Sequence, residues 1–176
     1  DGTGITTLTT VGGSPFLQGL DVTANYLYWT NATSHTIQRS NLDGTGVTTL
    51  TAAGGNIPYG IDATDTYLYW VNLTGKQLQR SNLDGTGVTT LIDSIDMVGA
   101  PSGIFVSDAA IYFTQQYHGV YRANLDGTGL TQLVTGSSDY RFIDGQVSAI
   151  PEPSTYALLA GGLALGLAAW RRRVAA

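Results

Sequence analysis

Short runs of apolar, aromatic and β-branched residues alternate with Gly, Asp and Asn as far as residue 134. The clearest group of four runs lies between Tyr59 and Ile92, and it is copied before and after with a period of about 42 residues. No stretch before Pro151 places apolar residues at helical spacing over three turns, so each run is predicted to be a β-strand. A fixed period of this length is typical of repeat folds.

Each repeat contains four predicted strands. The first strand is expected at 19–22, 60–63 and 103–106, and the second at 26–31, 67–72 and 111–115. The third is expected at 36–42, 77–83 and 119–125, and the fourth at 47–51, 88–92 and 130–134. Four strands in about 42 residues is the size of one β-propeller blade. The chain is therefore predicted to be all-β, with three full blades forming an open, partial propeller over residues 1–134.

Three sequence features recur once per repeat. An aromatic element centres on Trp29, Trp70 and Phe113, and an arginine recurs in the third strand as Arg39, Arg80 and Arg122. The turn Asp-Gly-Thr-Gly begins at Asp1, Asp43, Asp84 and Asp126. Three motifs follow one another along the chain in a fixed order: Tyr28-Trp29-Thr30-Asn31, then Arg39-Ser40-Asn41-Leu42-Asp43-Gly44, then Pro58-Tyr59-Gly60-Ile61-Asp62. This order resembles the YWTD, or low-density-lipoprotein-receptor class B, β-propeller repeat, and the resemblance covers residues 1–134.

The fourth motif position departs from that family. The family has Asp there, whereas this chain has Asn31, Asn72 and Gln115. The resemblance implies that the family's Asp makes an ordering contact that locks blades together. Neutral amides must make that contact here if it is made at all, and we expect this to affect the rigidity of the propeller rather than its fold.

The first residues fall inside a repeat. Asp1 to Thr9 match the turn and fourth strand of a blade whose other three strands do not precede them in the sequence. The family it resembles usually closes six blades, so the chain is expected to be part of a larger ring. An open set of blades exposes two faces rich in Tyr, Trp and Ile, and such faces favour self-association.

Composition excludes several function classes. There is no cysteine, so disulfide scaffolds and thiolate metal sites are excluded, although the redox compartment stays open. Before Ile150 five basic residues face twelve aspartates, a net charge near −7. Nucleic-acid binding needs a basic patch and is not expected.

The recurring turns and arginines have a structural interpretation. Each Asp-Gly-Thr-Gly loop offers a single carboxylate, whereas calcium needs six to eight converging oxygens. We therefore predict that Asp43, Asp84 and Asp126 cap turns in which glycines supply positive φ angles. The recurring arginines are expected to pair with a neighbouring blade or a turn, because a residue repeated in every blade is more often architecture than a site.

Candidate catalytic residues are few. His35 and His118 lie in non-equivalent turns without a second ligand at metal-binding spacing. Asp21 and Asp62 are expected in first strands that line a central channel, where they could contact a cation or a sugar hydroxyl. Phe105 takes their place in the third repeat, so no ring of carboxylates is predicted. No catalytic residue, metal site or cofactor is therefore expected.

Residues 135–150 are predicted to be a possible extra strand at Tyr140–Asp144 followed by a linker. Pro151 and Pro153 then end the β-domain, since proline cannot donate to a strand ladder. The uncharged segment from Ser154 to Trp170 has 17 residues and would span about 26 Å as a helix. That is slightly less than the apolar thickness of a bilayer, so a transmembrane helix is predicted, with interfacial residues at its end making up the difference.

The C-terminal segment, residues 151–176, closely resembles the PEP-CTERM sorting signal of Gram-negative bacteria. Pro151, Glu152 and Pro153 correspond to the motif, and the tail carries Arg171, Arg172 and Arg173. By the positive-inside rule these arginines stay in the cytoplasm while the blades are exported. The resemblance implies recognition of the motif by an exosortase and removal of the tail, so that the inner membrane is a transient anchor.

Two hypotheses about function follow. The first is a non-enzymatic exported protein that binds or scaffolds at the cell surface or in the extracellular polymer matrix, with a polysaccharide or a protein as its ligand. The alternative is a six-bladed propeller hydrolase or lyase whose active-site residues lie in N-terminal blades outside this sequence. The fold alone does not decide between them.

Overall fold

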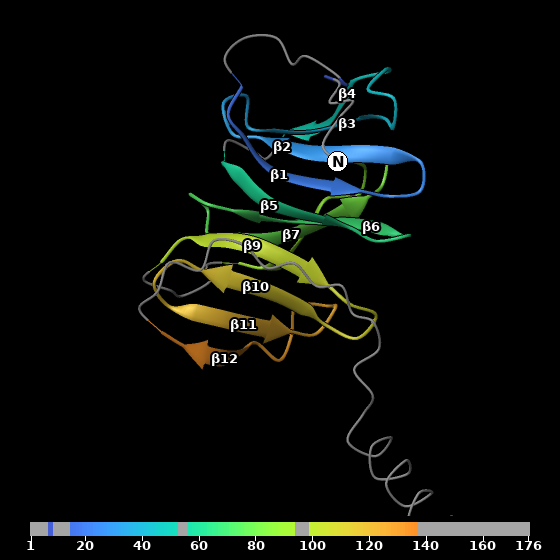
Figure 1. The fold of residues 1–176 in the computed structure, drawn as a ribbon. Helices are drawn as coiled ribbons and strands as arrows, with labels where there is room; N and C mark the ends of the chain where they lie inside the picture. Colours follow the sequence, from blue (N-terminus) through green and yellow to red (C-terminus); the bar gives the residue numbers. More distant parts are fainter. Residues whose placement is uncertain (1–6, 9–14, 53–55, 94–98, 137–176) are drawn as a thin grey trace, which may run out of the picture. The chain divides into compact units, whose positions relative to one another are not determined.

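The computed structural model describes residues 7–8, 15–52, 56–93 and 99–136, all of which lie in one compact unit, residues 1–145. These residues form three antiparallel sheets, each made of four strands that are consecutive in the sequence (Figure 1). Blade 1 comprises β1 (Leu17–Val22), β2 (Tyr26–Asn31), β3 (Thr36–Asn41) and β4 (Thr48–Ala52). Blade 2 comprises β5 (Pro58–Ala63), β6 (Tyr67–Asn72), β7 (Gln77–Asn82) and β8 (Thr89–Ile92). Blade 3 comprises β9 (Pro101–Val106), β10 (Ile111–Gln115), β11 (Gly119–Ala123) and β12 (Thr131–Thr135).

The strand predictions are confirmed to within about two residues at each end. The described residues are all-β, as expected, and contain twelve strands. The predicted extra strand at 140–144, the linker, the sorting motif, the apolar segment and the arginine tail lie outside the described residues. Among the described residues, no helix is long and apolar enough to cross a membrane.

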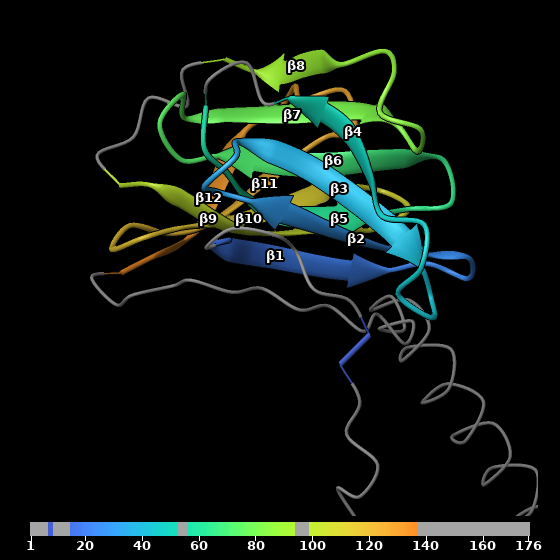
Figure 2. The ribbon, with the colours of Figure 1, turned by 90° about the horizontal axis from the view of Figure 1, so that it is seen from above.

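The first strands of the blades, β1, β5 and β9, lie next to one another in sequence order (Figure 1, Figure 2). The second strands supply most of the core: Tyr28, Trp70 and Phe113 are fully buried. The outer strand β12 is exposed along its whole length. In blades 1 and 2 the second strand is more buried than the first, as its repeated apolar residues predict, and in blade 3 burial is lost at the outer strand.

The Asp-Gly-Thr-Gly turns form closed hydrogen-bonded units. Asp43 Oδ1 accepts hydrogen bonds from the backbone N–H of Thr45 at 2.9 Å and from its hydroxyl at 2.7 Å. Asp84 and Asp126 make the same pair of bonds with Thr86 and Thr128. Gly44 has a φ of 83°, a conformation that favours glycine. These Asp side chains thus serve the turn, and the bonds they accept lower the pKa of each carboxyl.

Consecutive blades approach each other so closely that only glycine fits between their first strands. A Cβ atom at Gly19 would lie 2.6 Å from the carbonyl oxygen of Tyr59 and 2.9 Å from the amide nitrogen of Ile61. A Cβ atom at Gly60 would collide in the same way with the carbonyl of Ser102. The contact between consecutive blades, called here a junction, is therefore made once between blades 1 and 2 and again between blades 2 and 3.

Candidate ligand-binding site

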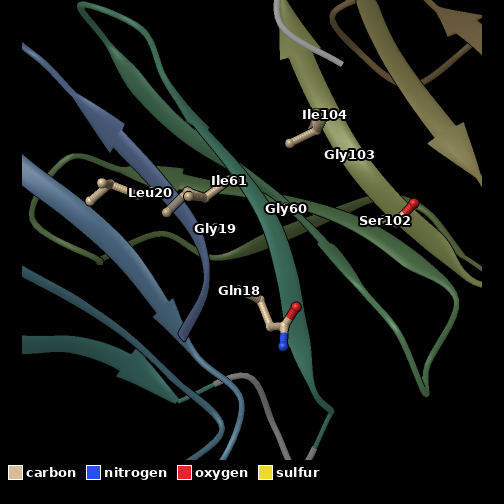
Figure 3. Close-up of a pocket in the computed structure, with 8 residues that line it drawn as sticks. All are labelled: Gln18, Gly19, Leu20, Gly60, Ile61, Ser102, Gly103 and Ile104. Carbon is tan, nitrogen blue, oxygen red and sulfur yellow. The ribbon is translucent and has the colours of Figure 1, made fainter. Parts of the chain in front are cut away.

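The first strands of all three blades border a cavity of about 300 Å³ (Figure 3). Glycines and aliphatic side chains form most of this inner cavity, and its polar side chains are Gln18 and Ser102. The hydroxyl of Ser102 lies 3.2 Å from that of Thr114, so part of its hydrogen-bonding capacity is already used. Among the described residues, no acid, base or cation lines the cavity, which suits these walls to apolar contact rather than to proton transfer.

Asp21 and Asp62, the predicted channel residues, hold the junctions together. Asp21 Oδ2 accepts a hydrogen bond from the N–H of Ala63 at 2.6 Å, and Asp62 Oδ2 accepts one from Val106 at 3.2 Å. Neither residue borders the inner cavity. In blade 3 the equivalent Phe105 stacks on Tyr112, with ring centroids 6.3 Å apart.

Asp62 is electrostatically unusual. Burial, the largest cause, raises the pKa of its carboxyl from 3.8 to about 6, and the negative charge of Asp21 adds to the shift. The hydrogen bond from Val106 acts in the opposite direction. A shifted carboxyl is one mark of a functional site, but here the group is explained by its position between two blades.

The repeated aromatic residues occupy equivalent positions in the sheets. Trp29 donates from its indole N–H to Gln38 Oε1 at 3.0 Å, whereas the buried Trp70 Nε1 has no partner among the described residues. Phe113 instead stacks on Tyr121, with centroids 5.6 Å apart. All three are buried, so they act as core side chains.

The repeated arginines differ between junctions. Arg39 lies 4.3 Å from the centre of the Tyr26 ring and donates to the carbonyl of Leu83 in blade 2 at 3.2 Å. This is the blade-to-blade pairing that the repeat predicted. Arg80 lies 4.4 Å from the Tyr67 ring and makes no such bond to blade 3 among the described residues. Arg122 holds the equivalent position opposite Tyr112 in the next sheet.

The amides at the fourth motif position act inside their own blades. Asn31 Oδ1 accepts hydrogen bonds from the N–H groups of Thr33 and Ser34, at 3.1 and 3.2 Å. Asn72 Nδ2 donates to Gln79 Oε1 at 2.7 Å, and Gln115 Nε2 donates to the carbonyl of Gly99 at 2.7 Å. None of these hydrogen bonds crosses a junction.

Thr30 makes a junction contact that the sequence analysis missed. Its hydroxyl accepts a hydrogen bond from the N–H of Gly19 at 2.8 Å and donates to the carbonyl of Tyr59 in blade 2 at 2.6 Å. Thr114 accepts the equivalent bond from Gly103 at 2.9 Å, whereas blade 2 has Val71 at this position. The recurrence of Thr in two of three motif copies was the available signal.

A second concave surface of about 390 Å³, the interblade groove, lies between blades 2 and 3. Its charged side chains are Asp65 and Asp108, from equivalent exposed turns, and Arg80. The hydroxyls of Thr64 and Ser107 are engaged in those turns. Among the described residues the two carboxylates have no hydrogen-bond or ion-pair partner, so the groove presents free acceptors beside a guanidinium. The groove could not be predicted from the sequence, because it depends on how two blades meet.

The two histidines line neither concave surface. His35 lies in the turn before β3 with a φ of 56°, and His118 lies in the turn before β11. In the part of the chain that the structure describes, no three His, Cys, Asp or Glu residues gather closely enough to hold a metal ion.

Comparison with known proteins identifies the C-terminal segment and the fold. Residues 149–173 match the model of the PEP-CTERM protein-sorting motif, as the sequence predicted. No curated protein matches the sequence significantly.

Solved β-propeller structures resemble the chain. A chain in the crystal structure of a nidogen/laminin complex superposes with a TM-score of 0.61 and 25% identity, covering 69% of this chain and 50% of that one. Catalytically inactive virginiamycin B lyase from Staphylococcus aureus, a histidine-to-alanine variant solved with quinupristin, superposes with a TM-score of 0.63 and 18% identity. This match covers 76% of this chain and 47% of the lyase chain. The computationally designed Ika4 protein superposes with a TM-score of 0.60 and 14% identity, covering 80% of this chain and 87% of the designed one. The chain thus spans about half the length of the nidogen/laminin chain and of the lyase, and its three sheets are propeller-like blades.

Proposed function

We propose that this chain is a non-enzymatic binding or scaffolding protein of the bacterial cell surface or extracellular polymer matrix, built from YWTD-type blades. The PEP-CTERM motif at residues 149–173 supports this, because it implies an extracellular protein that an exosortase sorts. The proposal rests on which charged side chains are engaged within the fold and which are available to a ligand. Asp21 and Asp62 are engaged in junctions, while Asp65, Asp108 and Arg80 remain available in the interblade groove.

The groove favours a hydroxyl-rich polymer over an apolar ligand. Free carboxylates accept hydrogen bonds from hydroxyl groups, and a guanidinium donates to ligand oxygens in a fixed fork. Arg80 is held in place by the Tyr67 ring, so less of its freedom is lost on binding. A polysaccharide of the matrix offers both hydroxyl donors and oxygen acceptors, whereas the acidic chain repels a polyanion.

The alternative, a hydrolase or lyase, is favoured by its likeness in fold to the virginiamycin B lyases. That likeness concerns the fold alone at 18% and 20% identity. An acid–base mechanism needs a titratable group within reach of the substrate. Neither His35 nor His118 borders the inner cavity or the groove, and the titratable acids of the groove are the exposed Asp65 and Asp108. The enzyme alternative places its active-site residues in further, N-terminal blades.

A glycan-array screen with the purified full chain in mild detergent tests the proposal. We expect binding to one or more polysaccharides, weakened about tenfold or more when Asp65 and Asp108 are both changed to Asn. Gln18→Ala, in the inner cavity, is the matched control and should leave the affinity unchanged. Failure to bind any polysaccharide would overturn the ligand class, and turnover of a lactone substrate by the chain would support the enzyme alternative.

A further inference from the structure

The turn between the third and fourth strand of each blade contains a chemically reactive pair, Asp followed by Gly. In a flexible chain the backbone nitrogen of the glycine attacks the side-chain carbon Cγ of the Asp, and glycine has no side chain to hinder the attack. The new N–Cγ bond closes a succinimide ring, while the amide proton leaves with the carboxyl hydroxyl as water. Water then opens the ring, giving either the original aspartate or an isoaspartyl linkage, in which the backbone runs through the side chain. The pairs in the described turns are Asp43-Gly44, Asp84-Gly85 and Asp126-Gly127.

The fold does not allow another residue in place of the glycine. Gly85 has a φ of 84°, and a Cβ atom there would lie 2.6 Å from the carbonyl oxygen of Leu50 in the outer strand of blade 1. Gly127 has a φ of 85°, and a Cβ atom there would collide with the carbonyl of Leu91 in blade 2. The junctions therefore require the reactive pair, and an isoaspartyl linkage would add one carbon atom to the backbone at this close contact.

Hydrogen bonds occupy both reacting groups of the pair. Asp84 Oδ1 accepts bonds from the N–H of Thr86 at 2.9 Å and from its hydroxyl at 2.6 Å. The N–H of Gly85, the nucleophile, donates to the carbonyl of Asn82 at 2.9 Å. The Thr86 hydroxyl in turn accepts a bond from Asn82 Nδ2 at 2.9 Å, so one side chain connects the two halves of the turn. The same bonds, at 2.7–3.0 Å, recur in the turns of blades 1 and 3.

We infer that the threonine of each turn, Thr45, Thr86 or Thr128, protects the preceding Asp-Gly pair from isoaspartate formation. Before Asp84 can react, its carboxylate must leave both donors of Thr86, and the Gly85 N–H must leave its carbonyl partner. The bond from the Thr86 hydroxyl, and then that from its N–H, lowers the pKa of the Asp84 carboxyl. Less of the carboxyl therefore carries the proton that allows oxygen to leave as water. All three threonines are exposed, so core packing does not account for their recurrence.

The isoaspartate content of the full chain, aged in mild detergent at neutral pH, tests this role. Peptide mapping by mass spectrometry measures each turn separately. In the folded wild type each pair should react about tenfold or more slowly than in the same chain unfolded in urea, because the bonds to the carboxylate are lost there. Equal rates in the two states would overturn the proposal.

Thr45→Val and Thr45→Ser separate the hydroxyl from the shape of the side chain. Val keeps the branched shape and the backbone N–H, so loss of the hydroxyl alone should speed isoaspartate formation at Asp43 by about three- to tenfold. Ser keeps the hydroxyl and should retain the wild-type rate. Asp84 and Asp126 in the same molecule are internal controls whose rates should not change, and Thr86→Val should accelerate Asp84 alone.

Three results would overturn the proposed role of the hydroxyl. They are failure of either Val variant to accelerate its own turn, an equal rise at all three turns, and a Ser variant that reacts as fast as the Val variant. Circular dichroism confirms that every variant retains its strands.

Discussion

Replacing Asp62 by Asn should remove a pH dependence from the stability of the blades. The Asp62 carboxyl lies at the junction of blades 2 and 3, where burial raises its pKa from 3.8 to about 6. The folded protein therefore holds the proton more tightly than the unfolded chain does. Between about pH 4 and pH 6 the folded state binds more protons, so stability falls as pH rises through this window and then levels off.

The size of the effect follows from the shift. Each pKa unit corresponds to about 1.4 kcal/mol, so the rise from 3.8 to about 6 corresponds to about 3 kcal/mol at full coupling. Asp62 is only half-buried, and solvent reaching the carboxylate lowers the expected value to about 2 kcal/mol. Asn removes the charge and keeps an oxygen that can accept the hydrogen bond from Val106.

Urea unfolding between about pH 4 and pH 8, at one fixed protein concentration, measures the effect. The wild type should lose about 2 kcal/mol between pH 4 and pH 6, while Asp62→Asn should stay nearly constant. Asp84→Asn is the control. Hydrogen bonds from Thr86 lower the pKa of the Asp84 carboxyl, so its contribution is lost only as the pH falls below about 4. Parallel curves for the wild type and Asp62→Asn from pH 4 to pH 7 would refute the argument that burial perturbs this carboxyl.

Three further predictions concern the junctions and the tail. Gly19→Ala should destabilise the blades by about 1–3 kcal/mol in urea unfolding, because the added Cβ would lie 2.6 Å from the carbonyl of Tyr59; an unchanged midpoint would contradict the close approach. Thr30→Val should cost about 1–3 kcal/mol and Thr30→Ser much less, since the hydroxyl links Gly19 to Tyr59; equal losses would refute this role. Two variants test the tail: one carries Glu152→Ala, and the other carries Ser in place of Arg171, Arg172 and Arg173. Each should leave the circular dichroism of the blades unchanged and stop release from the inner membrane. Intact-mass measurement of surface-extracted wild type checks this, and a mature species that still carries Arg171 to Ala176 would show a permanent anchor.

The strands were predictable because each is bounded by strong local signals. The aromatic run Tyr67–Asn72 specifies one strand, and the turn at Asp84 marks the end of the next strand, Gln77–Asn82, without help from the rest of the chain. The alternation of side chains along β1 does not by itself predict which neighbour the Asp21 carboxylate contacts. The pairing of β1 with β2 shifts register between Leu17 and Leu20, and such a bulge changes where later side chains point. Asp21 and Asp62 therefore serve a neighbouring blade instead of a central channel.

The neutral fourth motif position is compatible with specific junctions because other side chains now connect the blades. The amide of Asn31 orders a turn within blade 1, whereas Asp21 and Thr30 reach blade 2. Each of these two bonds to a backbone group depends on the close approach that Gly19 allows, so glycine and Asp act together. A local sequence motif does not reveal this coupling, because its two partners lie about 40 residues apart. Phe105 holds the equivalent position in blade 3 and follows Gly103, but its ring stacks on Tyr112 of its own blade, so the third copy keeps the glycine and carries an aromatic ring in place of the carboxylate.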